Sequence, residues 1–235
     1  MTEVSDTVTK SQQLSPTSEL NGFTWWKREM SYRLGLLLSG EMQQFEYDFY
    51  NRNLPEKCQQ CDKDLQWMLK YSPGVIFMMD NINKLQKDPL DSIANHITCD
   101  VCPDLQGGGF HPKYGILLCA NRLQSKWQLE DVLTHELVHA YDHLKFKVDL
   151  NDLNHHACTE IRASTLSGEC RIFNEIKKTG LGNFGKKFQD CVKRRATISV
   201  SHNPNCLSME EAEKVVDRVW QSCFNDTRPF ERVYR

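Results

Sequence analysis

The sequence predicts an α+β fold that is predominantly helical, with a small sheet beside one central helix and disulfide bonds holding the chain together. Residues 125–154 contain no Gly or Pro and carry apolar residues at helical spacing. Residues 97–122 instead contain short apolar runs between glycines, which is typical of strands. Ten cysteines are spread along the chain, and an even number suits a disulfide framework.

The N-terminal part begins with a polar segment and continues with helices. Residues 1–21 are rich in Ser, Thr and Gln with few apolar groups, so we expect them to be disordered. Residues 22–235 are long enough for one domain with a substantial core. Within them, apolar residues between 25 and 49 follow helical spacing, and Ser72-Pro73 opens another helix.

The strand region precedes the central helix. Gly107-Gly108-Gly109 predicts a turn, and Gly115 begins a run of apolar residues. A strand with a free edge can pair with an extended peptide. Residues 110–121 are the candidate for that strand; the alternative is a hairpin that serves only the core.

The central helix carries the sequence His135-Glu136-Leu137-Val138-His139. Residues four apart lie on one face of a helix, so the two histidines can bind one zinc ion together. Zinc lowers the pKa of a bound water to about 7, and Glu136 is placed to take its proton. Ser125 and Gln128 have the spacing of a capping box at the start of this helix. The competing interpretation is an amphipathic helix whose histidines face solvent.

A catalytic zinc site normally has a third protein ligand. The astacin-like pattern is excluded because Asp142 and Lys145 stand where Gly and His would be required. We therefore predict a zincin-like fold of the His₂Glu type, with Glu160 as the third ligand on a helix that continues to Ile176. Four rivals remain: Asp142, His143, and the histidines of the expected loop before that helix, His155 and His156. The alternative role for Asp142 is to accept a hydrogen bond from the second ring nitrogen of a metal-bound imidazole.

Composition and charge exclude several classes of protein. The formal net charge is −2, which argues against a nucleic-acid binder. No apolar run approaches the 18 to 20 residues of a membrane span. The N-terminal residues are polar and partly acidic, unlike a secretion signal or a mitochondrial transit peptide.

The cysteines allow two interpretations. Cys58, Cys61, Cys99 and Cys102 form two Cys-x-x-Cys pairs, the ligand pattern of a structural zinc site. That site would leave six cysteines unexplained, so disulfides are favoured, and they require an oxidising compartment.

The C-terminal third contains a basic segment and a final helix. Residues 171–195 carry eight basic and two acidic residues, which predicts either a solvated helix face or attraction to an anionic membrane surface. Residues 209–224 read as the last helix.

Several stretches together resemble one known family. They are Trp25-Trp26-Lys27-Arg28, Gly108-Gly109-Phe110 with Pro112, Gly115-Ile116 with Leu118-Cys119 and Asn121, residues 135–142, Cys158-Thr159-Glu160-Ile161-Arg162-Ala163, Asn203-Pro204-Asn205-Cys206, and residues 223–230. The chain resembles the mitochondrial inner-membrane metalloproteases that process and help assemble the ATP synthase, and looks like a fungal member of that family.

The resemblance implies a location, a substrate and partners. It implies a protein attached peripherally to the inner membrane on its intermembrane-space side, imported by the disulfide relay that would oxidise its cysteines. It implies a zinc endopeptidase that removes an N-terminal segment from the precursor of ATP synthase subunit 6. It also implies a chaperone role in joining that subunit to the subunit 9 ring, which need not require proteolysis. The alternative function is a non-proteolytic assembly chaperone with an incidental metal site.

Overall fold

The computed structural model describes residues 22–86, 92–103, 106–170 and 184–231. The chain divides into two compact units, an N-terminal unit (Met1–Leu54) and a C-terminal unit (Pro55–Arg235). The disorder predicted for residues 1–21 lies outside the described residues. The single domain expected for residues 22–235 stays a prediction.

The N-terminal unit is a pair of helices joined through aromatic side chains. Helix α1 (Gly22–Arg33) and helix α2 (Ser39–Asn51) confirm the helical spacing of this region. Trp25 stacks on Phe45 with ring centroids 4.9 Å apart, and both rings are buried. Arg28 Nη2 lies 2.9 Å from the buried Asp48 carboxylate, so the one buried charge of α2 has a cationic partner.

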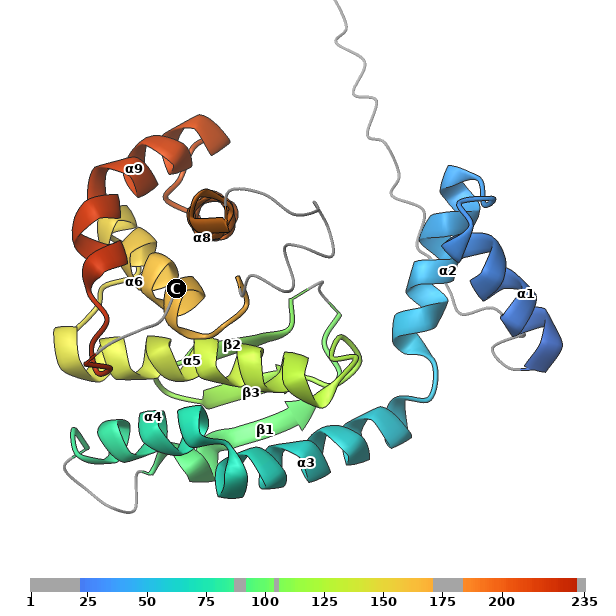
Figure 1. The fold of residues 1–235 in the computed structure, drawn as a ribbon, viewed down its shortest axis with the longest axis horizontal. Helices are drawn as coiled ribbons and strands as arrows, with labels where there is room; N and C mark the ends of the chain where they lie inside the picture. Colours follow the sequence, from blue (N-terminus) through green and yellow to red (C-terminus); the bar gives the residue numbers. More distant parts are fainter. Residues whose placement is uncertain (1–21, 87–91, 104–105, 171–183, 232–235) are drawn as a thin grey trace, which may run out of the picture. The chain divides into compact units, whose positions relative to one another are not determined.

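The C-terminal unit contains a small sheet, with α5 lying along it and the helices α6, α8 and α9 on the other side of α5 (Figure 1). Its elements, in chain order, are α3 (Leu54–Tyr71), α4 (Pro73–Asn83), a 3₁₀ turn η2 (Ile93–His96), β1 (Ile97–Asp100), β2 (Gly108–His111), β3 (Gly115–Cys119), α5 (Lys126–Phe146), α6 (Leu153–Leu166), α8 (Phe184–Ser201) and α9 (Met209–Asn225). The predicted α+β class, mainly helical with a small sheet, is confirmed.

Two of these helices begin where their capping residues predicted. Ser72 Oγ accepts a hydrogen bond from Val75 N at the start of α4, 3.3 Å away. Ser125 Oγ accepts from Gln128 N at the start of α5, 3.2 Å away. Each bond satisfies an amide that would otherwise lack a partner in the first helical turn.

The sheet corrects the predicted strand. The strand order is β1-β3-β2, with β1 parallel and β2 antiparallel to β3, so β3 is central and β2 is an edge strand. The single strand expected over residues 110–121 is wrong, because a turn before Gly115 divides it. Gly115 has a φ of +87°, and a Cβ there would lie 2.1 Å from His96 O, so only glycine fits.

Two apolar cores meet along α5 and α6. One contains buried side chains of α3, α4, the sheet and α5. The other lies among α6, α8 and α9. Helices α5 and α6 pack on each other between these cores. The residues where they meet are therefore supported by one core on the α5 side and by the other on the α6 side.

Four disulfides join the elements: Cys61–Cys99, Cys102–Cys119, Cys158–Cys223 and Cys170–Cys191. They confirm the disulfide interpretation and exclude the four-thiolate zinc site, since three of its four cysteines are oxidised in disulfides. Two cysteines, Cys58 and Cys206, are free thiols.

The basic segment is partly engaged in ion pairs within the chain. Residues 171–183 lie outside the described residues, and the remainder belongs to α8. Lys193 Nζ lies 2.6 Å from Asp217, and Arg195 Nε lies 2.7 Å from Glu169. Across the residues that the structure describes, the helices are too short or too polar to span a membrane.

Candidate metal centre

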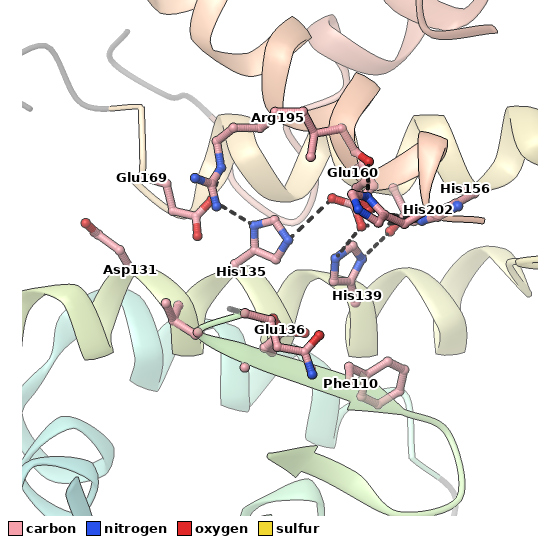
Figure 2. A pocket seen from close by; sticks show the side chains of 18 of the residues that line it. Phe110, Asp131, His135, Glu136, His139, His156, Glu160, Glu169, Arg195 and His202 are labelled. Atoms are coloured by element: carbon pink, nitrogen blue, oxygen red, sulfur yellow. Dashed lines mark hydrogen bonds and ion pairs between the residues drawn. The ribbon is translucent and has the colours of Figure 1, made fainter. Parts of the chain in front are cut away.

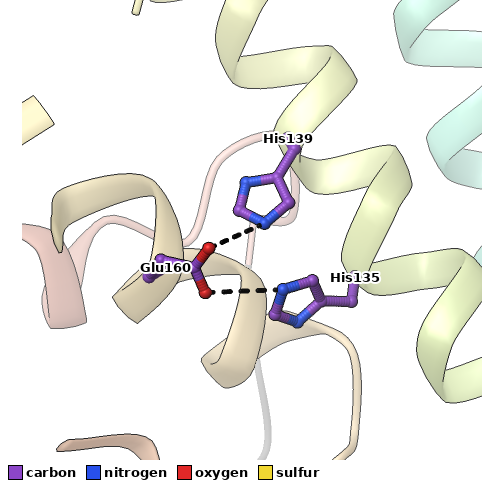
Figure 3. Close-up of side chains that lie close together, drawn as sticks. All are labelled: His135, His139 and Glu160. Carbon is purple, nitrogen blue, oxygen red and sulfur yellow. Dashed lines mark ion pairs between the residues drawn. The ribbon is translucent and has the colours of Figure 1, made fainter. Parts of the chain in front are cut away.

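Two helices bring the predicted ligands together. His135 and His139 project from one face of α5 toward α6, and Glu160 projects from α6 to meet them (Figure 3). Glu160 Oε2 lies 3.6 Å from His135 Nε2, and Glu160 Oε1 lies 3.4 Å from His139 Nε2. One ligand atom from each residue falls within 4.8 Å of the others, and all three side chains are largely buried.

These distances fit a tetrahedral metal ion. Ligand atoms about 2.0–2.1 Å from a tetrahedral zinc are separated from each other by roughly 3.3 Å. The two contacts of the Glu160 carboxylate are close to that spacing. Two imidazoles and one carboxylate are also the donor set of a catalytic zinc with an open fourth position. The residues present therefore fit the ion that the sequence predicts.

Most of the rival ligands lie in other interactions. Asp142 pairs with Arg162, the His143 ring lies 6.0 Å from that of Phe110, and His155 Nδ1 accepts from Asp149 N. His156 lies beside the site, with Nε2 3.6 Å from Glu160 Oε1.

Helix α6 differs from its predicted bounds. It starts at Leu153, so His155 and His156 belong to its first turn and not to a loop. It ends at Leu166, before the predicted Ile176, which lies outside the described residues, and Gly168 follows with a φ of +94°. The Asp152 cap, which accepts from Asn154 N, explains the early start.

His139 is held from behind by a chain of buried polar groups. Its Nδ1 lies 2.9 Å from Thr159 Oγ1, which donates to Asp142 Oδ2 at 2.9 Å. Arg162 donates to both oxygens of Asp142 and also to the carbonyl of Asp226. Asp142 thus acts on His139 through Thr159, in the outer position that the sequence allowed for it. Such partners fix the orientation of a metal-binding imidazole.

His135 has an outer partner that sequence reasoning missed. Its Nδ1 lies 3.1 Å from Glu169 Oε2, and Glu169 pairs in turn with Arg195 (Figure 2). Burial lowers the pKa of His135, but the Glu169 and Glu160 carboxylates outweigh it and raise that pKa well above its usual value. The two carboxylates therefore favour a positive charge at this point, which suits a cation site. Glu169 stands after α6 without any local pattern that marks it, so only tertiary structure reveals it.

His139 and Glu136 have the protonation behaviour that the chemistry needs. Burial lowers the pKa of His139 to about 4, so its imidazole is neutral at pH 7, as a metal ligand must be. Burial raises the pKa of Glu136 to about 7, near the operating pH that suits a general base. The backbone N–H of Phe110 donates to this carboxylate, which faces β2 (Figure 2).

The site opens into a large cleft of about 1660 Å³. Its lining includes the three candidate ligands, Glu136 and the edge strand β2. Cys119 N donates to Gly107 O, so these two residues form a hydrogen-bonded pair between β3 and the start of β2. Such pairs alternate along antiparallel strands, so the backbone N–H and C=O of Gly109 also point toward β3. The alternate residues Gly108 and Phe110 therefore direct their backbone polar groups away from β3. The cleft thus combines a metal-binding group, a buried carboxylate and a free strand edge.

Comparisons with known proteins agree with this site. Residues 59–231, which contain every residue of the site, match the peptidase M76 family. The chain is 68% identical to the mitochondrial inner membrane protease ATP23 of Candida albicans, over 95% of this chain and 94% of that protein. It is 62% identical to the protein of that name from Debaryomyces hansenii (100% and 99%) and 53% identical to that from Saccharomyces cerevisiae S288c (91% and 96%). No solved structure shows a significant match. The chain belongs to the peptidase M76 family.

Proposed function

We propose that this protein is a zinc-dependent endopeptidase at the mitochondrial inner membrane, on its intermembrane-space side, and that it removes the N-terminal segment of the ATP synthase subunit 6 precursor. The observation that carries the reaction type is the convergence of His135, His139 and Glu160 in one cleft with the buried Glu136. The substrate and the side of the membrane follow from the family resemblance, and the four disulfides support an oxidising compartment entered through the disulfide relay.

The residues of the chain divide the work of hydrolysis. Zinc, when bound by His135, His139 and Glu160, supplies a Lewis acid that lowers the pKa of water. Glu136 takes a proton from the attacking water and returns it to the leaving amide nitrogen. Gly108 and the carbonyl of Phe110 present backbone groups to an extended peptide, so the substrate pairs with the edge of β2 beside Glu136.

Metal dependence tests this proposal directly. Treatment of the purified protein with a chelator should abolish cleavage of the subunit 6 precursor, and about one equivalent of zinc should restore it. Measuring cleavage and bound metal in the same samples checks both points. Full cleavage by protein shown to contain no metal would contradict the proposal.

The proposed chaperone role concerns the same precursor and the subunit 9 ring. The resemblance implies that this role need not require proteolysis, so a variant without hydrolytic activity separates the two functions. Assembly of the proton-translocating sector with that variant measures the chaperone role alone.

The edge strand provides a prediction with a matched control. A Cβ on Gly108 would lie 2.8 Å from Leu117 O and 2.9 Å from a Val132 methyl group, whereas a Cβ on Gly109 meets nothing within 4 Å. Gly108→Ala should push β2 away from α5, costing about 1–3 kcal/mol of unfolding free energy and much of the cleavage. Gly109→Ala should change both much less. Denaturant unfolding and cleavage assays check this, and equal behaviour of the two variants would refute it.

Membrane contact is proposed for one face of α1. Phe23, Trp26 and Met30 follow helical spacing on α1, and Leu34 continues that spacing as the first residue after the helix. They are 72%, 54%, 37% and 65% exposed, in that order. Phe23 stacks on Trp26, and the neighbouring Lys27 is exposed. An apolar face with aromatic and basic residues suits the interface of an anionic membrane. We favour this face over the basic segment, because Lys193 and Arg195 of that segment pair with Asp217 and Glu169 within the chain.

Vesicle binding tests the membrane proposal. Replacing Phe23, Trp26 and Leu34 by Ser should weaken binding to vesicles with anionic phospholipid by about tenfold or more, because each large side chain contributes about 1.5–3 kcal/mol when buried. Replacing Lys186 and Lys187 by Gln should have a smaller effect, and cleavage of a soluble peptide should persist in both variants. The reverse order of the two effects would return the assignment to the basic segment.

A further inference from the structure

Asn203 lies two residues after the end of α8, in the stretch Asn203-Pro204-Asn205-Cys206, and the residue is only 9% exposed. Every polar atom of this amide has a partner. Its Oδ1 accepts from Asn205 N at 2.9 Å, and its Nδ2 donates to Leu150 O at 2.8 Å. The same Nδ2 lies 2.9 Å from His156 Nδ1. Asn203 therefore joins the loop after α8 to the first turn of α6.

These contacts determine the tautomer of His156. A carbonyl can only accept and a backbone N–H can only donate, so Leu150 and Asn205 fix which end of the Asn203 amide is the nitrogen. That nitrogen donates to His156 Nδ1, which must then be the ring nitrogen without a proton. A neutral imidazole so held carries its proton on Nε2.

The Nε2 atom of His156 faces the metal centre. It lies 3.3 Å from Ser199 Oγ and 3.6 Å from Glu160 Oε1. The same oxygen of Glu160 lies 3.4 Å from His139 Nε2 (Figure 2). The proton on His156 thus lies between the Ser199 hydroxyl, which is within hydrogen-bond distance, and the Glu160 carboxylate 3.6 Å away, which meets both histidines of α5.

We propose that Asn203 and His156 are positioning residues for Glu160: Asn203 keeps the His156 proton on Nε2, and that N–H orients the carboxylate of the third ligand. This inference rests on the proposed function, because it takes Glu160 to be a metal ligand. Ligating carboxylates need hydrogen-bond partners for their remaining lone pairs, just as ligating histidines do. Thr159 and Glu169 serve the two histidines, and His156 serves the glutamate.

Asn205 provides a matched control in the same loop. Its side-chain nitrogen donates to Asn151 O at 2.9 Å, so it also bonds a backbone carbonyl of the loop before α6. Asn205→Ala therefore removes the same kind of link between these loops without removing the donor to His156. If Asn203 serves only to join the loops, Asn203→Ala and Asn205→Ala should behave alike.

The test uses the full-length protein with ¹⁵N-labelled histidine. Two-bond proton–nitrogen spectra, recorded without metal, show which ring nitrogen carries the proton, and the signal missing from His156→Gln identifies His156. Wild type and Asn205→Ala should carry the proton on Nε2. Asn203→Asp should move it to Nδ1, because a carboxylate of nearly the same shape can only accept there.

Zinc affinity, measured by competition with a coloured chelator, completes the test. Asn203→Ala and Asn203→Asp should bind zinc about tenfold or more weakly than wild type, and Asn205→Ala within about twofold. A wild-type proton on Nδ1, or equal zinc affinities of Asn203→Ala and Asn205→Ala, would overturn the positioning role alone. A wild-type protein that binds no zinc would overturn the proposed function and this role with it, whatever the tautomer.

Discussion

Replacing Glu136 by Gln is expected to reduce peptide cleavage by about 10²- to 10⁴-fold, the contribution of a general acid–base group. Gln has nearly the same shape as Glu but takes up no proton from water. The side chain is buried beside β2, where the Phe110 N–H donates to it, and an amide oxygen accepts that bond equally well. His135, His139 and Glu160 keep their positions in this variant, so zinc content should stay near that of wild type.

Glu130→Gln is the matched control for this variant. It makes the same replacement on the same helix, at a residue whose carboxylate accepts from Ser72 Oγ, and Gln keeps an acceptor there. Its cleavage rate and zinc content should both stay near wild type. Precursor cleavage and bound metal are measured in parallel for the two variants. If Glu136→Gln cleaves as fast as Glu130→Gln, Glu136 is not the base.

Most helices could be predicted from the sequence, because their signals are local. Ser72 and Ser125 cap helices through bonds to residues three positions later, which a sequence displays directly. The single strand predicted over residues 110–121 was wrong because its division does not arise from a local signal. Its division depends on the close approach of Gly115 to His96, a contact that spacing along the chain does not reveal.

The residues of the candidate site also fall into two groups, those that local sequence patterns predict and those that only tertiary contacts reveal. His135, Glu136 and His139 form one motif on one helix, so four-residue spacing sufficed to place them on a common surface. Glu160 could be selected because it stands on the helix predicted after the motif, where the His₂Glu arrangement takes its third ligand. Glu169 and Asn203 could not be selected as site residues, since each acts through a contact across helices. Asn203 stands in a stretch that carries the family resemblance, but nothing in that stretch points to the metal centre.

Glu160→Ala is expected to remove bound zinc from the protein. Each oxygen of Glu160 faces the Nε2 atom of a different histidine, so this carboxylate occupies the third corner of the group. Without it, His135 and His139 provide only two ligands, fewer than a catalytic zinc site requires. Metal analysis after gel filtration should find far less than the roughly one equivalent expected of wild type, and cleavage should be lost in proportion.

Glu169→Gln distinguishes this role from that of a neighbouring carboxylate. Glu169 meets His135 on its other ring nitrogen, Nδ1, where it orients the imidazole without facing His139. Its replacement should therefore weaken zinc binding by about 10- to 100-fold, the usual effect of losing an outer partner, and still permit saturation at higher zinc concentration. If Glu169→Gln lost zinc and Glu160→Ala retained it, the two carboxylates would exchange roles. Because they lie on opposite sides of the same imidazole, zinc titrations of both variants decide between them.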